Sequence, residues 1–373
     1  MKVVAAIDSF KGSMTSMEAG NAVKKGILAA KPDAEVWLSP LADGGEGTVD
    51  ALIEGLGAEK IPVTVAGPLG EKVSCYYGFL EETKTAVMEM ASAAGITLVI
   101  KKDPLRASTY GVGEMIADAL KRGCKNFMIG IGGSATNDGG IGMLKALGFE
   151  FFDEDGNDVG EGAAALAKIA EIRTEKKNPL LSGAKFQIAC DVKNPLCGKQ
   201  GATYIFGPQK GVTEEQKEQV DEAMRHYADV TKESLDCDFA DCEGAGAAGG
   251  LGYAFLSYLA GELILGVELI LQATGLEEKM KNADVVVTGE GRLDAQTVMG
   301  KAPAGVAALA KKYNAKVIAF AGSVAPEAKV CNRAGIDAFF PIVRGVTTLE
   351  EAMKKENAME NIAATAEQVF RLL

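Results

Sequence analysis

The sequence has a single histidine and a single tryptophan among its 373 residues. The histidine, His226, lies in an amphipathic helical segment, where a solvated or half-buried side chain is its ordinary role. Serine–histidine and cysteine–histidine catalytic triads are therefore not expected. Any chemistry must depend on carboxylates, lysines, arginines and backbone groups.

The sequence also lacks paired cysteines and long hydrophobic runs. Its seven cysteines are scattered without a Cys-x-x-Cys pair, which predicts reduced thiols in a cytoplasmic protein and no structural zinc site. Only a short apolar run precedes Asp8, so we expect no secretory signal. The uncharged stretch 244–261 contains six glycines and predicts a buried helix rather than a membrane span.

Basic residues are fewer than acidic residues in this sequence. The chain has 39 lysines and arginines against 51 aspartates and glutamates, a net charge of −12. This balance argues against nucleic acid as the main partner. A small anionic substrate stays compatible with it, because a few local cations override the global sign.

Short β-branched runs alternate with helical periodicity, a pattern typical of α/β proteins. Two apolar strands are expected near the start and three near the end, which predicts a flavodoxin-like doubly wound parallel sheet built from both termini. The expected strands are 3–7, 35–39, 283–289, 315–322 and 337–343, with helices at 16–30 and 302–313.

A chain of this length exceeds one ordinary core, so two domains are expected. We predict a discontinuous flavodoxin-like domain from 1–60 and 283–373, with a second α/β domain, 61–282, inserted into it. In the inserted part we expect a hairpin from 72–80 and 85–90, strands at 126–133 and 186–192, and a charged surface helix at 212–236.

Carboxylates follow three of the expected strands. Asp8, Asp43 and Glu290 each come directly after an apolar run and stand beside glycine or a basic residue. One such residue alone is explained by helix capping. Because ligands in open α/β sheets bind beyond the carboxyl ends of the strands, the three together predict a site.

A glycine-rich loop, "GIGGSATNDGG" (130–140), follows another apolar strand. Five of its eleven residues are glycine, and Ser134, Thr136, Asn137 and Asp138 supply short oxygen-bearing side chains. Glycine allows backbone N–H groups to approach a ligand closely, and a strand-to-helix loop directs such groups at an anion. The loop therefore predicts a phosphate or carboxylate site.

Two segments match dinucleotide-binding patterns formally. The segment 244–249 follows no buried strand, and the oxygen-bearing side chains after 130–135 suit phosphate or metal-bound water better. A Walker A sequence does not occur. These patterns therefore favour neither a Rossmann oxidoreductase nor a P-loop enzyme. An NAD-dependent oxidoreductase and a non-catalytic small-anion-binding protein are kept as alternatives.

The requirements of phosphoryl transfer are present. This reaction needs cations on the phosphates, carboxylates for magnesium, and donors to developing negative charge. Lysines lie inside glycine-rich loops at Lys11, Lys210 and Lys301, and further carboxylates are Asp191 and Asp294.

These loops together resemble the blocks of the glycerate kinase family that uses neither a P-loop nor a sugar-kinase fold. The resemblance follows that family's order from residue 3 to about residue 345, through "DSFKGS", "LADGGEGT", "GGSATNDGG", "CDVKNPLCG", "FGPQKG", "GAGAAGGLG" and "GEGRLDAQT". It implies transfer of the ATP γ-phosphoryl group to D-glycerate with Mg²⁺, in organic-acid or glyoxylate catabolism. It also implies an active site between two domains, and 2-phosphoglycerate as product rather than 3-phosphoglycerate.

Within this resemblance we assign expected roles. Asp191 and Asp294 are candidates for general base or magnesium ligand, with Glu290 as a third metal ligand. Arg292 is the first candidate for binding the glycerate carboxylate and Arg106 the second, because a planar fork suits a carboxylate. Lys11 balances anionic charge.

The remaining expected roles concern binding. The ATP phosphates are assigned to Gly132, Gly133, Ser134, Thr136 and Asn137, with Lys210 and Lys301. The substrate is assigned to Asp8, Ser9, Asp43, Gly44, Arg106 and Glu290. We expect a monomer or a homodimer without nucleic-acid or membrane partners.

Overall fold

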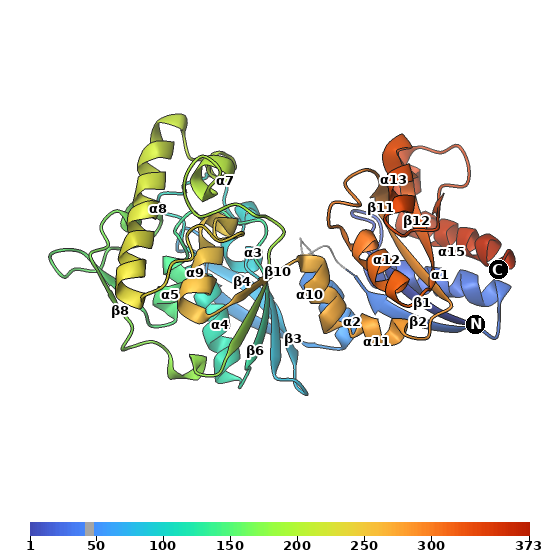
Figure 1. The fold of residues 1–373 in the computed structure, drawn as a ribbon, viewed down its shortest axis with the longest axis horizontal. Helices are drawn as coiled ribbons and strands as arrows, with labels where there is room; N and C mark the ends of the chain where they lie inside the picture. The colour runs from blue at the N-terminus through green and yellow to red at the C-terminus, as the bar shows by residue number, and fades with distance from the viewer. Residues whose placement is uncertain (42–47) are drawn as a thin grey trace. The chain divides into compact units, whose positions relative to one another are not determined.

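The computed structural model describes residues 1–41 and 48–373 and divides into two compact units (Figure 1). Unit 1 comprises Met1–Asp43, Asp50–Gly57 and Val267–Leu373, and unit 2 comprises Gly44–Val49 and Ala58–Gly266. The chain thus returns to unit 1 at Val267 rather than at the expected residue 283. The reason is that helices α10 (Gly266–Ala273) and α11 (Leu276–Met280) bury apolar side chains such as Ile270 and Met280 there.

Unit 1 is built on one five-stranded parallel sheet with the order β13-β12-β11-β1-β2. Counted along the chain, this is the order 2-1-3-4-5 of flavodoxin-like folds, so the predicted fold class is confirmed. The strands are β1 (Lys2–Ile7), β2 (Glu35–Pro40), β11 (Val285–Leu293), β12 (Lys316–Val324) and β13 (Ala338–Pro341).

Helices cover this sheet because its strands are apolar on both faces. Alternate residues of β1, Val3, Ala5 and Ile7, form one core with α1 (Ser16–Ala30) and α15 (Lys355–Arg371). The helix α12 (Ala302–Lys312) contacts β11 and β12. The other helices of this unit are α2 (Thr48–Leu56), α13 (Val330–Arg333), α14 (Leu349–Met353) and the 3₁₀ turn Pro326–Lys329.

Unit 2 contains a six-stranded mixed sheet with the order β10-β9-β6-β5-β4-β3. The expected hairpin is confirmed, since β4 and β5 pair antiparallel, whereas β5, β6, β9 and β10 are parallel. The strands are β3 (Glu59–Ala66), β4 (Lys72–Leu80), β5 (Thr85–Glu89), β6 (Asn126–Gly130), β9 (Lys185–Ala189) and β10 (Glu262–Ile264). A separate antiparallel pair is formed by β7 (Glu150–Phe152) and β8 (Glu171–Arg173).

An aromatic core fills unit 2. Phe127 and Phe186 stack with ring centroids 4.7 Å apart, and Tyr227 meets Tyr253 edge-on. The helices are α3 (Ala91–Ala94), α4 (Tyr110–Lys121), α5 (Ile141–Ala146), α6 (Ala163–Leu166), α7 (Ala202–Lys210), α8 (Glu214–Leu235) and α9 (Leu251–Leu259), with 3₁₀ turns at Ile96–Leu98, Pro179–Leu181 and Ala247–Gly249.

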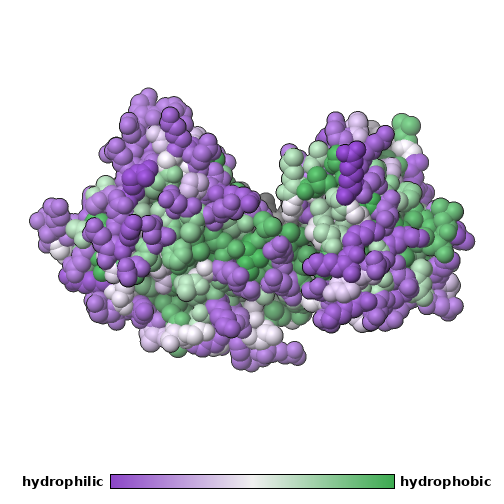
Figure 2. Space-filling view, in the orientation of Figure 1, coloured by the Kyte–Doolittle hydropathy of each residue, from purple (hydrophilic) through white to green (hydrophobic). Residues whose placement is uncertain are grey.

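The charged helix α8 has the predicted surface character. It buries one stripe that includes Met224 and Tyr227, and its outer face is hydrophilic (Figure 2). The uncharged stretch 244–261 forms a short turn and the buried helix α9, as expected. None of the helices within residues 1–41 and 48–373 is long and apolar enough to cross a membrane.

Candidate active site

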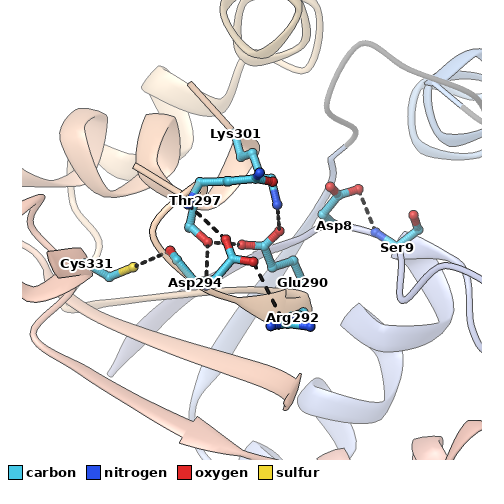
Figure 3. A network of polar contacts seen from close by, with 9 residues as sticks. Asp8, Ser9, Glu290, Arg292, Asp294, Thr297, Lys301 and Cys331 are labelled. Atoms are coloured by element: carbon cyan, nitrogen blue, oxygen red, sulfur yellow. Dashed lines mark hydrogen bonds and ion pairs between the residues drawn. The ribbon is translucent and has the colours of Figure 1, made fainter. Parts of the chain in front are cut away.

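The first group of site residues lies where β1 and β11 end in unit 1 (Figure 3). Asp8 follows β1 directly, and its backbone N–H donates to the Gly289 carbonyl oxygen at 2.9 Å. The Ser9 N–H donates to Asp8 Oδ1 at 2.7 Å. Glu290 lies within β11 rather than after it, because β11 and β12 stay paired as far as Leu293 and Val324.

Glu290 is a buried carboxylate with a side-chain partner at each oxygen. The Thr297 hydroxyl donates to Glu290 Oε1 at 2.6 Å, and Lys301 Nζ lies 3.4 Å from Oε2 (Figure 3). Burial raises the pKa of Glu290, while the bonds from Thr297 and Lys301 oppose that rise. No role for Thr297 was predicted from the sequence, although its position close to Glu290 and Asp294 was a usable signal.

Thr297 also connects Glu290 to the second carboxylate of this group. Its hydroxyl oxygen accepts the Asp294 N–H at 3.2 Å, and Asp294 Oδ1 accepts the Gln296 N–H at 2.9 Å. Arg292 Nε lies 3.5 Å from Asp294 Oδ2, but 69% of the Arg292 side chain is exposed. A guanidinium held so loosely keeps donors for an anionic ligand.

Part of this group, including Asp8, Glu290 and Lys301, lines a cavity of about 420 Å³ in unit 1. Its charged lining combines cations with carboxylates, and the rest of its wall is largely apolar. A concave, mostly apolar site with a few placed polar groups is the usual form of a small-molecule site. The charged lining residues are Asp8, Lys11, Glu290, Arg292 and Lys301.

The second group is the glycine-rich loop of unit 2, which a buried carboxylate organises from within. Asp138 accepts hydrogen bonds from the Thr109 N–H and hydroxyl, both at 2.8 Å, and from the N–H groups of Gly140 and Gly142 at 3.1 and 3.3 Å. Burial raises its pKa, and these bonds oppose that rise. Asp138 therefore shapes the loop.

Three residues that were predicted from the sequence to bind phosphate are buried, and two of them belong to this loop. Lys210 Nζ donates to the Thr136 carbonyl oxygen at 2.7 Å, and Asn137 Nδ2 donates to Thr203 Oγ1 at 3.0 Å. Thr136, Asn137 and Lys210 are fully or almost fully buried, and burial lowers the pKa of Lys210 to about 7. In this structure Lys210 and Asn137 hold the loop from the protein interior, and the contact of the three side chains with a phosphate stays a prediction.

The exposed part of the loop is its backbone near the end of β6. Gly132 and Gly133 are exposed, and the side chain of Ser134 retains slight exposure. Gly133 has φ +74°, a conformation that favours glycine, and a Cβ at Gly132 would meet no atom within 4 Å. These three residues are therefore the part of the loop that is exposed in this structure.

The other predicted site residues of unit 2 lie outside the glycine-rich loop, far from it in the sequence. Asp191 follows β9 and is exposed, and its Oδ1 accepts the Gly266 N–H at 2.9 Å. Arg106 is exposed in the turn before α4. Asp43 and Gly44 lie outside the described residues. Within the described part of the chain, no three His, Cys, Asp or Glu side chains form a group that could hold a metal ion.

The fold defines a two-unit α/β protein, and both groups carry donors that suit an anionic ligand. Residues 3–373 match the model of the glycerate kinase family. Curated relatives include the glycerate kinase of Bacillus subtilis (strain 168), 45% identical over 99% of this chain and 97% of that protein, and the glycerate 2-kinase of Escherichia coli (strain K12), 45% identical over 98% of each. A crystal structure of "putative glycerate kinase 2" from Salmonella typhimurium LT2 matches with a TM-score of 0.91 and 43% identity, over 99% of this chain and 97% of that one.

The chain therefore belongs to the glycerate kinase family. This confirms the family that the loop motifs indicated. It also favours a kinase over both alternatives, the NAD-dependent oxidoreductase and the non-catalytic anion-binding protein.

Proposed function

We propose that this protein is a glycerate kinase, which transfers the γ-phosphoryl group of ATP to a hydroxyl of D-glycerate in organic-acid or glyoxylate catabolism. The observation that carries the proposal is the match of residues 3–373 to one family of kinases. The full-length likeness to a relative named glycerate 2-kinase supports 2-phosphoglycerate as the product, with 3-phosphoglycerate as the alternative.

Magnesium ATP fits the chemistry of the residues at the unit 1 cavity. Lys11 and Lys301 supply cations for phosphates, and the nearby carboxylates supply the oxygen ligands that Mg²⁺ prefers. At this cavity Asp294 suits the role better than Glu290, because Glu290 already has Thr297 and Lys301 at its two oxygens. Asp191 of unit 2 stays a separate candidate for a magnesium ligand. When bound, Mg²⁺ neutralises phosphate charge.

A carboxylate must receive the proton of the attacking hydroxyl, and we assign this role to Asp191 or Asp294. The sole histidine is unsuited, because His226 lies on α8 with its Nε2 2.7 Å from the Ile169 carbonyl oxygen. Either carboxylate would hold the hydroxyl by a hydrogen bond and take its proton as the phosphoryl group moves.

Two further groups would hold the anionic parts of the substrates. Arg292, largely exposed beside Asp294, is the first choice for the glycerate carboxylate, and Arg106 the second. We assign the exposed backbone of Gly132 and Gly133, with Ser134, to an ATP phosphate. We further propose a cytoplasmic enzyme, monomeric or homodimeric, without nucleic-acid or membrane partners.

A coupled assay for ADP tests the proposal. ADP release that requires both D-glycerate and Mg²⁺ is the expected result. ATP left intact with D-glycerate, together with binding of NADH in an absorbance titration, would contradict it and favour the oxidoreductase.

A further inference from the structure

The cavity of unit 1 has an apolar wall that the chemistry of glycerate does not use. Its charged lining comes from the ends of β1 and β11 and from the start of α12, as described above. Its apolar lining comes from other elements, namely the loop after β1, the end of β13, and helices α14 and α15. The apolar lining residues are Phe10, Ile342, Val343, Leu349, Ala352, Met353 and Ala358.

Glycerate alone does not match this wall. Every carbon of glycerate carries oxygen, so the molecule gains little from burial against methionine, leucine and phenylalanine side chains. The volume of the cavity, about 420 Å³, also lies in the range of sites for much larger ligands. A complementary ligand has a broad, weakly polar part joined to an anionic part.

We infer that this cavity binds the nucleoside of ATP, with the purine against the apolar wall and the phosphate chain directed to Lys11 and Lys301, while Arg292 stays assigned to the glycerate carboxylate. This inference rests on the proposed kinase function. The three cations outnumber the two carboxylates of the lining, Asp8 and Glu290, so the polar side of the cavity suits a polyphosphate accompanied by Mg²⁺.

A polar side chain of the cavity lining fits a purine edge. Asn361, on α15, lines the cavity alongside Ala358. A carboxamide presents a donor and an acceptor side by side, the pattern that pairs with the amino group and adjacent ring nitrogen of adenine. Asn361 is therefore the residue that we expect to favour adenine over guanine.

The test fills the apolar part of the cavity and leaves the charged part intact. Ala352→Trp on α14 places an indole where the purine would bind, and Ala308→Trp, at an exposed position of α12 outside the cavity lining, is the matched control. We expect Ala352→Trp to raise the KM for ATP by about tenfold or more while the KM for D-glycerate changes little, and Ala308→Trp to change neither. An unchanged KM for ATP, or a rise in the KM for D-glycerate alone, overturns the inference.

Direct binding of ADP separates this inference from the proposed function. Calorimetry with Mg-ADP and no glycerate should show binding to the wild-type protein and to Ala308→Trp but weak binding to Ala352→Trp. That result supports the nucleotide site even for a protein that fails to phosphorylate glycerate. Loss of ADP binding with an unchanged KM for ATP would instead indicate an effector site and overturn the inference.

A second variant covers the case in which Ala352→Trp does not fold. Asn361→Leu keeps a similar volume and removes the carboxamide. We expect the ratio of kcat/KM for ATP to that for GTP to fall by about tenfold, since the adenine edge loses a paired polar group. An unchanged ratio contradicts the placement of the purine at Asn361.

Discussion

Lys210 Nζ donates a 2.7 Å hydrogen bond to the carbonyl oxygen of Thr136, and both residues are buried. The Lys210 side chain thus anchors the glycine-rich loop to the protein interior. Asp138 accepts hydrogen bonds from the Gly140 and Gly142 N–H groups at the end of the loop. A loop fixed in this way presents the backbone of Gly132 and Gly133 without having to reorganise on binding.

The burial of Lys210 predicts a characteristic pH dependence of stability. Its pKa falls from 10.5 to about 7 because burial disfavours the ammonium form, while Asp138 opposes the fall. Between these pH values the unfolded state binds more protons, so the free energy of unfolding rises with pH in this window. We expect wild-type stability, relative to Lys210→Met, to increase between pH 7 and pH 9 by at most about 1.4 kcal/mol per pH unit.

Chemical unfolding of both proteins at each pH measures this difference. The difference between the two proteins is used because the buried thiols, present in both, change the free energy of unfolding with pH in the opposite direction. Burial raises the pKa values of Cys75 and Cys124 to about 11, so their contribution to stability is lost above the ordinary thiol pKa of 9.0. A pH-independent difference would show that Lys210 stays protonated in the folded protein.

Gly132 offers a test of the anion site that does not strain the fold. A Cβ there meets no atom within 4 Å, and its φ lies outside the left-handed region. We expect Gly132→Val to keep the melting temperature and to raise the KM for ATP about tenfold or more, because the side chain blocks approach to the N–H groups. Gly133→Val at φ +74° would be destabilised as well, which makes it the less informative variant. Unchanged ATP kinetics in a folded Gly132→Val would remove the loop from the site.

Asp191 and Asp294 can be separated by matched amide substitutions. Asn keeps the oxygen that accepts the Gly266 N–H at Asp191 and the one that accepts the Gln296 N–H at Asp294, so both local structures should survive. The carboxylate that serves as base should lose about 10²-fold or more in kcat on conversion to Asn. Steady-state kinetics with saturating Mg-ATP distinguishes them, and full kcat in both variants would exclude both as the base.

Thr297 should set the acid limit of activity through Glu290. Its hydroxyl lowers the pKa of Glu290 against the effect of burial, so Thr297→Val should raise that pKa further. Since Glu290 must be ionised to pair with Lys301, the acid limb of the kcat/KM profile should move to higher pH in Thr297→Val. Thr297→Ser, which keeps the hydroxyl, should retain the wild-type profile. Identical profiles for all three proteins would show that the ionisation of Glu290 does not limit activity.

Much of unit 1 could be predicted because its signals are local. The helix 16–30 has the expected bounds, and the capping box between Thr15 and Glu18 fixes its start. The strand β3 was missed, since Pro62 interrupts its pattern, although an edge strand tolerates proline. Long apolar strands can thus be located from the sequence. An edge strand with an interrupted pattern, such as β3, forms because it pairs with a neighbouring strand.

The proximity of some candidate site residues could be predicted, but their surroundings could not. Asp8 and Glu290 lie at neighbouring strands because β1 pairs with β11, a consequence of the sheet order. The burial of Lys210 could not be predicted, because a lysine in a glycine-rich loop has the same sequence pattern whether solvent or protein surrounds its side chain. Its environment depends on tertiary contacts that the local sequence does not encode.

Phosphorus NMR of the protein incubated with Mg-ATP and D-glycerate tests the glycerate kinase activity itself. We expect a new phosphomonoester signal that matches 2-phosphoglycerate and grows as the γ-phosphate signal of ATP declines. A signal at 3-phosphoglycerate would keep the kinase and correct the acceptor hydroxyl. Intact ATP and no new signal would contradict the proposed function.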